Sequence, residues 1–292
     1  MLVMTATRGR SVSKFIVDRI ARIVPTYWCV TILSAVGALV LARPWIFGIY
    51  DHLNAKMFVH SLLFIPQASQ TIVPQGWTLN VEMFFYALFA ATLFLPRATQ
   101  IFALSAILSS FVAFGLVMNL SAGTETIYVY FNPRLLEFAG GLVIGELWLR
   151  DRLSSRMFGV GATLSGFFAA QLATITPVGR PGIWIAGSVM IVAGVLTCES
   201  QFKLPKIAPL ASVGDASYII YLIHTPIVML IKLQHWLAIS IQIVLAITIC
   251  VTAALIALPL ERRIVSYTRE RLNRAWKSLL IVFRSRGDTV RP

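Results

Sequence analysis

The chain has 292 residues, of which 58% are hydrophobic and 13% are charged, and its mean hydropathy is +0.79. A soluble domain carries about a quarter charged residues, so this composition excludes a soluble globular protein. The net charge of +13 does not indicate a nucleic-acid-binding protein, because the basic residues lie in the loops between apolar runs.

The apolar runs are continuous rather than alternating, which favours membrane-spanning helices over the strands of a barrel. A helix needs about 20 apolar residues to cross about 30 Å of hydrocarbon. We therefore predict an all-α, polytopic transmembrane helical bundle with about eight spanning helices. They cover residues 24–42, 77–95, 101–118, 133–149, 157–176, 182–198, 213–232 and 237–260.

The loops between these runs indicate the orientation. Placing the N-terminus in the cytoplasm puts most of the 25 Lys and Arg residues in cytoplasmic segments. The basic residues left outside are Arg43, Lys56, Arg180 and Lys232, with Arg134 near a helix start. Because cytoplasmic loops of membrane proteins carry an excess of Lys and Arg, both termini are predicted to be cytoplasmic.

Two segments are not expected to span. Residues 52–73 contain the apolar stretch FVHSLLFIP, which is too short to cross and is expected at the outer interface. The tail is basic and amphipathic, with Leu272, Trp276, Leu279 and Phe283 on one face. It is expected on the anionic inner leaflet, which divides the chain into a membrane domain (1–260) and a cytoplasmic tail (261–292).

A basic segment, KFIVDRIARIVPTYW, precedes the first predicted span and carries Lys14, Arg19 and Arg22 on its cytoplasmic side. These residues either anchor the segment to the membrane surface or form a cationic site for a phosphorylated donor. Arginine suits the second role because its guanidinium makes charge-assisted hydrogen bonds to phosphate.

The segment GWTLNVEMFFY places a carboxylate, Glu82, inside a predicted span. An ionisable group in hydrocarbon costs roughly 2.5 to 3.5 kcal/mol on insertion scales, so it usually marks a functional site. Thr78, Glu82 and Tyr86 recur every four residues and form one polar stripe, from which Asn80 points away. Glu82 is either a structural carboxylate or a contact for substrate or protons.

The segment NPRLLEFAGG brings together Arg134 and Glu137, which are three residues apart and can form an ion pair. This pair either only stabilises the helix start or lines a polar site. Gly141 and Gly145 form a GxxxG pattern, which predicts close helix packing.

The segment GDASYIIYLIHTP carries Ser217, Tyr221 and His224 at positions i, i+4 and i+7, so they share a helix face. His224 is expected near the middle of the bilayer, where the accompanying hydroxyls favour a polar site over an isolated structural histidine. Asp215 is predicted to be the N-cap of this helix.

Four motifs resemble, in the same order, those of the membrane acyltransferase-3 family, which includes bacterial O-antigen and exopolysaccharide acetylases. They are RIARIVPTYW, FIPQ followed by GWTLNVEMFFYALF, NPRLLEFAGGLVIG and VGDASYIIYLIHTP. The resemblance covers nearly the whole chain. It implies a multi-pass protein of the bacterial inner membrane that transfers an acyl group, commonly acetyl from acetyl-CoA, to a hydroxyl of a saccharide.

The resemblance also implies roles for the residues above. Glu82, Glu137 and His224 become the catalytic candidates, and Arg19 and Arg22 the donor-binding ones. The residues expected to bind the acceptor are Arg134, Tyr86, Tyr221 and Ser217. Acyl-CoA is expected as a co-substrate, with no bound cofactor or metal. The expected partners are membrane lipid and a saccharide or lipid-linked saccharide, and no nucleic acid.

The start of the chain departs from the family pattern. Family members usually have ten spans and begin with a helix that carries a basic residue and a histidine, the expected catalytic base. The stretch MLVMTATRGR resembles only the end of the second helix, so the first two helices are expected to be absent. Either the true start lies upstream of Met1, or the chain is a truncated, inactive relative. His52 and His60 match no family motif.

Two other functions compete with acyl transfer. In a proton-coupled transporter or flippase of a saccharide or lipid carrier, Glu82, Glu137 and His224 would relay protons. Transporters often show paired broken helices in related halves, and the sequence has no such symmetry. A non-catalytic partner in a polysaccharide export complex is the third interpretation.

Overall fold

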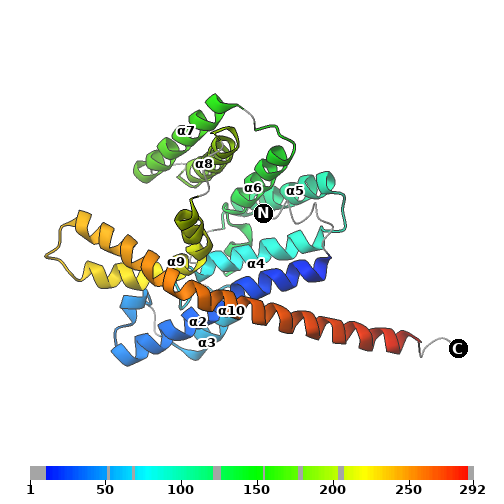
Figure 1. Ribbon diagram of the computed structural model, residues 1–292, viewed down its shortest axis with the longest axis horizontal. Helices are drawn as coiled ribbons and strands as arrows, with labels where there is room; N and C mark the ends of the chain where they lie inside the picture. The colour runs from blue at the N-terminus through cyan, green and yellow to red at the C-terminus, as the bar shows by residue number, and fades with distance from the viewer. Residues whose placement is uncertain are drawn as a thin grey trace. The chain divides into compact units, whose positions relative to one another are not determined.

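The computed structural model describes residues 11–50, 53–67, 70–120, 126–153, 155–176, 180–202 and 207–288. Over this part of the chain it contains nine α-helices, two short 3-10 helices and no strand, which confirms the predicted all-α fold (Figure 1). The elements are α2 (Val12–Leu41), η1 (Pro44–Phe47), α3 (Ala55–Leu62), α4 (Gly76–Ala91), α5 (Arg97–Val117), η2 (Thr126–Phe131), α6 (Leu135–Leu149), α7 (Arg156–Ile175), α8 (Arg180–Phe202), α9 (Ala208–Lys232) and α10 (Ile239–Asp288).

Six of the described helices are long and apolar enough to cross a membrane: α2, α5, α7, α8, α9 and α10. Helices α4 and α6 have 16 and 15 residues. At 1.5 Å per residue each is only about 24 Å long, less than the roughly 30 Å of hydrocarbon. The count of eight spans and the cytoplasmic position of both termini therefore stay predictions.

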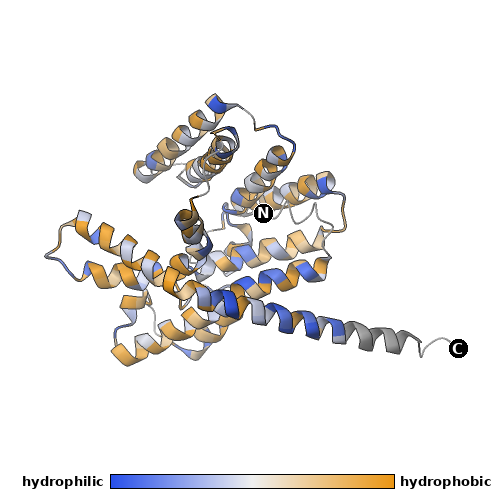
Figure 2. Ribbon diagram, in the orientation of Figure 1, coloured by the Kyte–Doolittle hydropathy of each residue, from blue (hydrophilic) through white to orange (hydrophobic). Residues whose placement is uncertain are grey.

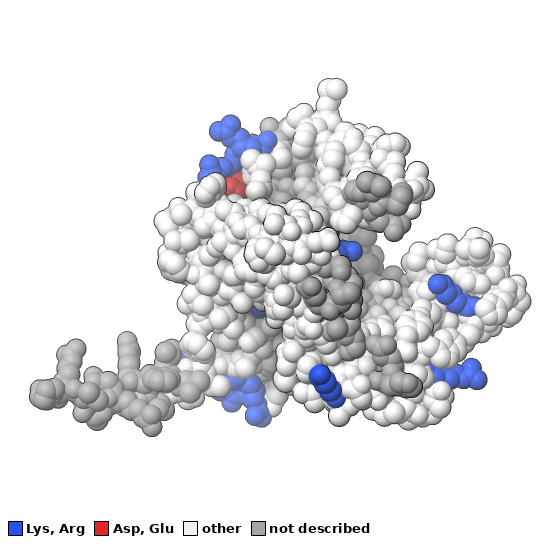
Figure 3. Space-filling view, turned by 180° about the vertical axis from the view of Figure 1, so that it is seen from behind, with Lys and Arg blue, Asp and Glu red and all other residues white. Residues whose placement is uncertain are grey.

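Large apolar side chains cover the outside of the spanning helices. Leu33 and Val40 on α2 and Ile256 on α10 are 69%, 76% and 76% exposed. Figure 2 shows apolar residues along most of the helices, and charged side chains occupy little of the face shown in Figure 3. In water such a surface would be unfavourable, so these faces suit contact with lipid tails.

The chain forms two compact units, and the boundary between them falls within α4. The first unit is Val81–Lys206, in which α7 packs along α8 and α6 packs on α8. Small residues allow the close approach of α7 and α8: a Cβ added at Gly187 would lie 3.0 Å from the Gly166 carbonyl oxygen. Glycines thus let α7 and α8 approach each other closely, as is common in membrane bundles.

The predicted GxxxG contact of α6 is wrong in one respect. A Cβ added at Gly141 would meet nothing within 4 Å among the described atoms, whereas one at Gly140 would lie 2.6 Å from a methyl carbon of Val189 on α8. Gly140 rather than Gly141 therefore faces the neighbouring helix.

The second unit comprises Ser11–Asn80 and Ile207–Pro292. Its helices α9 and α10 form an antiparallel pair, in which Ala216 and Ile219 of α9 pack against Ala254 and Leu258 of α10. Helix α2 also packs on this pair, and the Tyr218 hydroxyl of α9 donates a hydrogen bond of 3.0 Å to the Ile23 carbonyl of α2.

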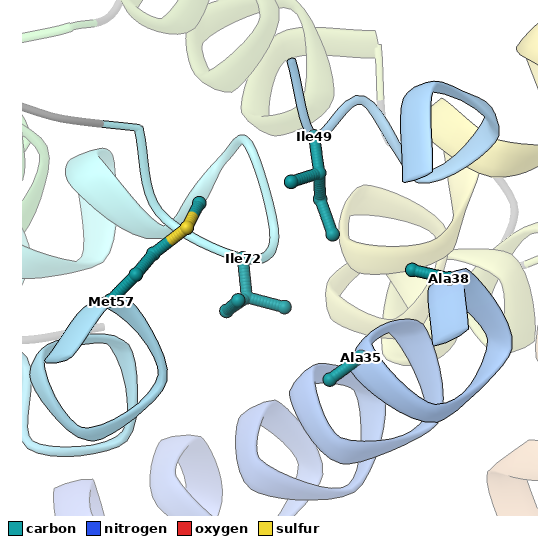
Figure 4. Close-up of a cluster of buried hydrophobic side chains, with 5 residues drawn as sticks. All are labelled: Ala35, Ala38, Ile49, Met57 and Ile72. Atoms are coloured by element: carbon teal, nitrogen blue, oxygen red, sulfur yellow. The ribbon is translucent and has the colours of Figure 1, made fainter. Parts of the chain in front are cut away.

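A small apolar cluster joins the loops of the second unit to α2. Ala35 and Ala38 of α2 point toward Ile49, Met57 and Ile72, which come from the loop after η1, from α3 and from the loop before α4 (Figure 4). All five side chains are at least nine-tenths buried. Helix α3 has eight residues, which agrees with the expected short, non-spanning segment. The cluster fixes the loop that leads into α4.

Helices α2 and α9 begin well before their predicted first residues, 24 and 213. Helix α9 starts at Ala208, so Asp215 lies within it and is not its N-cap; its Oδ2 atom instead lies 2.6 Å from Nη2 of Arg262 on α10. Helix α2 starts at Val12, so the basic segment 14–28 is continuous with the first span. Proline at the second position of α9, Pro209, suits a helix start and explains the earlier beginning.

Helix α10 continues without a break from the last apolar run into the basic tail. It has 50 residues, which at 1.5 Å per residue gives about 75 Å. Figure 2 shows its first part as largely apolar and the coloured stretch that follows as largely hydrophilic. The predicted boundary at residue 260 lies inside this one helix, and the position of the tail on the inner leaflet stays a prediction.

Candidate functional site

The second unit contains a chain of hydrogen bonds that starts where α4 begins. The Thr78 hydroxyl donates to the Gln75 carbonyl oxygen at 2.8 Å and lies 2.5 Å from the hydroxyl of Tyr221 on α9. Because a hydroxyl has one hydrogen, and that of Thr78 is used at Gln75, the Tyr221 hydroxyl donates to Thr78. Tyr221, predicted to contact the acceptor, is thus tied to the polar stripe predicted on α4.

His224 lies one turn further along α9 and is half-buried. Its Nδ1 atom is 2.7 Å from the carbonyl oxygen of Tyr221. A carbonyl oxygen can only accept a hydrogen bond, so Nδ1 carries a hydrogen. In the neutral ring the other nitrogen, Nε2, is then the basic one.

A residue that the sequence analysis missed, Gln75, meets His224. Its amide nitrogen lies 3.1 Å from Nε2 and 3.3 Å from Nδ1 of the histidine, and it donates a hydrogen bond to the Thr225 hydroxyl. The only signal in the sequence was a polar residue between Pro74 and Gly76, at a predicted helix start. Its partner is 149 residues away, a separation that helix periodicity does not reveal.

Two glycines let the loops approach this cluster. A Cβ added at Gly76 would lie 2.5 Å from the hydroxyl oxygen of Tyr27, which is 1% exposed, and 2.9 Å from Oγ1 of Thr71. Gly48 has a φ of 73°, and a Cβ there would lie 2.9 Å from a methyl carbon of Thr225. Neither site has room for a side chain, so the loops form a closely packed wall beside His224.

In the first unit, α4 carries Glu82 and Tyr86, both half-buried. The Tyr86 hydroxyl donates to Oε1 of Glu82, one turn earlier on the same helix. The stripe predicted from the four-residue spacing therefore contains a direct contact. The bond orients the carboxylate and supplies part of the hydrogen bonding that its burial requires.

The predicted pair at the start of α6 is present but weak. Nη1 of Arg134 is 3.9 Å from Oε1 of Glu137, with 55% and 33% of the two side chains exposed. The Arg134 backbone N–H donates to the Asn132 side chain at 3.0 Å, which ties Arg134 to the preceding turn. Tyr128 of η2 lies nearby: burial raises its pKa, and the positive charge of Arg134 opposes that rise.

Arg19 and Arg22 lie on α2 in the second unit. The Arg19 guanidinium is 5.8 Å from the centre of the Phe15 ring, and the charge of Arg22 attracts that of Glu261 on α10. Ser217 is exposed on α9, where the neighbouring Tyr218 makes the contact with α2.

The predicted site residues divide between the two units. Glu82, Tyr86, Arg134 and Glu137 belong to the first, whereas Ser217, Tyr221, His224, Arg19 and Arg22 belong to the second. Within the second unit the structure brings Tyr221 and His224 to the start of α4. The predicted channel shared by Glu82, Glu137 and His224 stays a prediction.

Comparison with known proteins identifies the family. An acyltransferase domain, acyltransferase-3, matches residues 1–262. The chain belongs to this family. It is also 34% identical over 237 residues to the exopolysaccharide production protein ExoZ of Rhizobium meliloti (strain 1021), an alignment that covers 77% of this chain and 71% of that protein. No solved structure matches the chain.

As a member of the acyltransferase-3 family, the chain is an acyltransferase. The six helices capable of spanning a membrane among the described residues agree with a multi-pass membrane protein. Transfer of an acyl group to a hydroxyl needs a group that removes the hydroxyl proton. Among the described residues, His224 has Nδ1 bonded to the Tyr221 carbonyl oxygen and Nε2 left as the basic nitrogen, so it is a candidate for that step.

Proposed function

We propose that this acyltransferase moves an acyl group, acetyl in the first instance, from acyl-CoA to a hydroxyl of an exopolysaccharide or cell-surface sugar in the bacterial inner membrane. The observation that carries the proposal is the similarity to a protein named for exopolysaccharide production, over most of both chains. The half-buried His224 beside Tyr221 and Thr78 supports transfer to a hydroxyl, because these groups suit a polyhydroxyl acceptor.

In this proposal His224 is the general base. Nε2 takes the proton of the acceptor hydroxyl while the hydroxyl oxygen attacks the carbonyl carbon of the acyl-CoA thioester. The carbon–sulfur bond then breaks, and the proton passes from the imidazole to the leaving thiolate of CoA. A positioned general base of this kind contributes about 10²- to 10⁴-fold to a rate.

The remaining candidates take supporting roles. Arg19 and Arg22 are proposed to bind the phosphates of the donor, for which a guanidinium is suited. Glu82 and Glu137 are proposed as further catalytic residues, and Arg134, Tyr86, Tyr221 and Ser217 as residues that bind the acceptor. In the membrane interior such polar groups are costly, so each is expected to have a partner in substrate or protein.

The test uses membranes that carry the protein, incubated with radiolabelled acetyl-CoA and a polysaccharide acceptor. We expect label in the polysaccharide, and a loss of about 10²-fold or more in the His224→Ala variant. His235→Ala is the matched control, because His235 is exposed in the turn after α9. Saccharide uptake driven by a pH gradient, with no acyl-CoA consumed, would show a transporter instead.

A further inference from the structure

The backbone of Gln75 is held firmly at the start of α4. Its carbonyl oxygen accepts hydrogen bonds from the backbone N–H of Thr78 at 3.0 Å and from the Thr78 hydroxyl at 2.8 Å. The residue is 9% exposed, and the next residue, Gly76, has no space for a side chain. The point from which the Gln75 side chain leaves the main chain is therefore fixed relative to α9.

The amide nitrogen of Gln75 faces the His224 ring rather than the lone pair of one nitrogen. It is nearly equidistant from the two ring nitrogens, at 3.1 and 3.3 Å. An atom on the lone-pair axis of Nε2 would be much further from Nδ1, so the amide lies over the ring and its N–H points at the ring face. The in-plane lone pair of Nε2 is therefore not used by this amide.

The nitrogen and the oxygen of the Gln75 side-chain amide have different surroundings. Its nitrogen contacts both His224 and the Thr225 hydroxyl, whereas Oε1 is buried with no hydrogen-bond partner among the described residues. An unsatisfied buried acceptor costs about 1 to 3 kcal/mol. The amide therefore adds little to stability, and its contact with His224 gives a reason for a glutamine at this position.

We propose that Gln75 is a positioning residue, which holds the His224 ring between its amide and the Tyr221 carbonyl so that Nε2 is presented to the acceptor hydroxyl. The Tyr221 carbonyl selects the Nδ1–H form of the ring, and Gln75 fixes the ring's rotation. The catalytic consequence rests on the proposed role of His224 as the general base. The ring geometry itself does not depend on that role.

The ring state is measured by ¹⁵N NMR of the full chain, labelled at histidine and held in detergent micelles at alkaline pH. The chain has four histidines, and the signal lost in His224→Ala assigns His224. We expect the hydrogen on Nδ1 in the wild-type protein. In Gln75→Glu, which keeps the size of the side chain, the negative charge of the carboxylate beside the ring favours the imidazolium form, so Nε2 gains a hydrogen. A purely structural role for Gln75 predicts no such gain.

Acyl transfer by the same variants gives the functional readout. Gln75→Ala is expected to lower kcat about 10- to 100-fold, the effect of misplacing a catalytic group, and to leave KM for acyl-CoA unchanged. Gln70→Ala is the control, because Gln70 lies in the same loop but bonds to the backbone of Gly48 and Tyr50. Its His224 signal is expected to match the wild type.

Four results overturn the proposal. Unchanged His224 signals in both Gln75 variants would show that the amide does not control the ring. An equal change in Gln70→Ala would assign the effect to the loop as a whole. Full activity in Gln75→Ala with none in His224→Ala would remove the positioning role alone. Full activity in His224→Ala, in contrast, would overturn the base role in the proposed function, and this proposal with it.

Discussion

Arg97 at the start of α5 forms an ion pair with Glu146 near the end of α6: Nε of the arginine lies 2.7 Å from Oε2 of the glutamate. Arg150 shares the same carboxylate, with its Nε 2.6 Å from Oε1. Only 12% of the Glu146 side chain is exposed, against 31% and 54% for Arg97 and Arg150. One carboxylate thus joins two helices of the first unit at one end.

Removal of this carboxylate should destabilise the protein. Glu146→Ala leaves Arg97 and Arg150 without their acceptor, and we expect a loss of about 1 to 3 kcal/mol in the free energy of unfolding, less than for a fully buried pair because both arginines reach solvent. The measurement is the midpoint of thermal unfolding in detergent. Glu199→Ala, at an exposed position of α8, is the control and should stay within about 0.5 kcal/mol. Equal shifts in both variants would contradict a structural role for the pair.

The existence of the long helices could be predicted from the sequence, because a continuous apolar run of about 20 residues is typical of a membrane-spanning helix. Their beginnings could not. The Gly214–Asp215 pair predicts an N-cap at Asp215, but α9 already begins at Ala208 and Asp215 pairs with Arg262 instead. Choosing between a cap and an ion pair requires knowledge of α10, which the local sequence does not contain.

The candidate site shows the same limit. The sequence predicts that Tyr221 and His224 share a face of one helix and that Glu82 and Tyr86 share a face of another. Helix geometry alone places the two residues of each pair close together. The role of Gln75 could not be predicted from the sequence, because its contacts with α9 come from tertiary packing. Spacing along the chain therefore finds candidate faces, and only the fold identifies the partner across from them.

The close packing of α7 and α8 gives a second prediction. A Cβ added at Gly194 would lie 2.3 Å from Oγ1 and 2.5 Å from the backbone nitrogen of Thr163. Gly194→Ala should force the two helices apart and cost about 1 to 3 kcal/mol, seen as a lower midpoint of thermal unfolding. Gly182→Ala places a methyl group where nothing lies within 4 Å and should cause no loss. A Gly194→Ala protein as stable as Gly182→Ala would show that the helices do not touch there.

Two ion pairs of α10 should differ in strength. Arg269 Nε lies 2.8 Å from Oδ1 of Asp18 on α2, whose side chain is 12% exposed, whereas Asp215, paired with Arg262, is 62% exposed. Solvent screens the exposed pair, so Asp215→Ala should change stability by less than about 0.5 kcal/mol. Asp18→Ala should cost about 1 kcal/mol or more. Thermal unfolding of the two single variants tests the order, and a larger loss at Asp215 would reverse this interpretation.

The length of α10 predicts on which side of the membrane its ends lie. From Ile239 the helix is about 75 Å long, more than twice the roughly 30 Å of hydrocarbon, so its basic second half must leave the membrane. The excess of Lys and Arg there predicts the cytoplasmic side.

In a protein whose Cys29, Cys198 and Cys250 are replaced by serine, a cysteine introduced at His235 should react with a membrane-impermeant maleimide added to intact cells. One introduced at Ser278 should react only after the membrane is permeabilised. Both positions are exposed, so reaction depends on the side of the membrane rather than on burial. Labelling of Ser278→Cys in intact cells would place the C-terminal half of α10 outside and overturn the predicted topology.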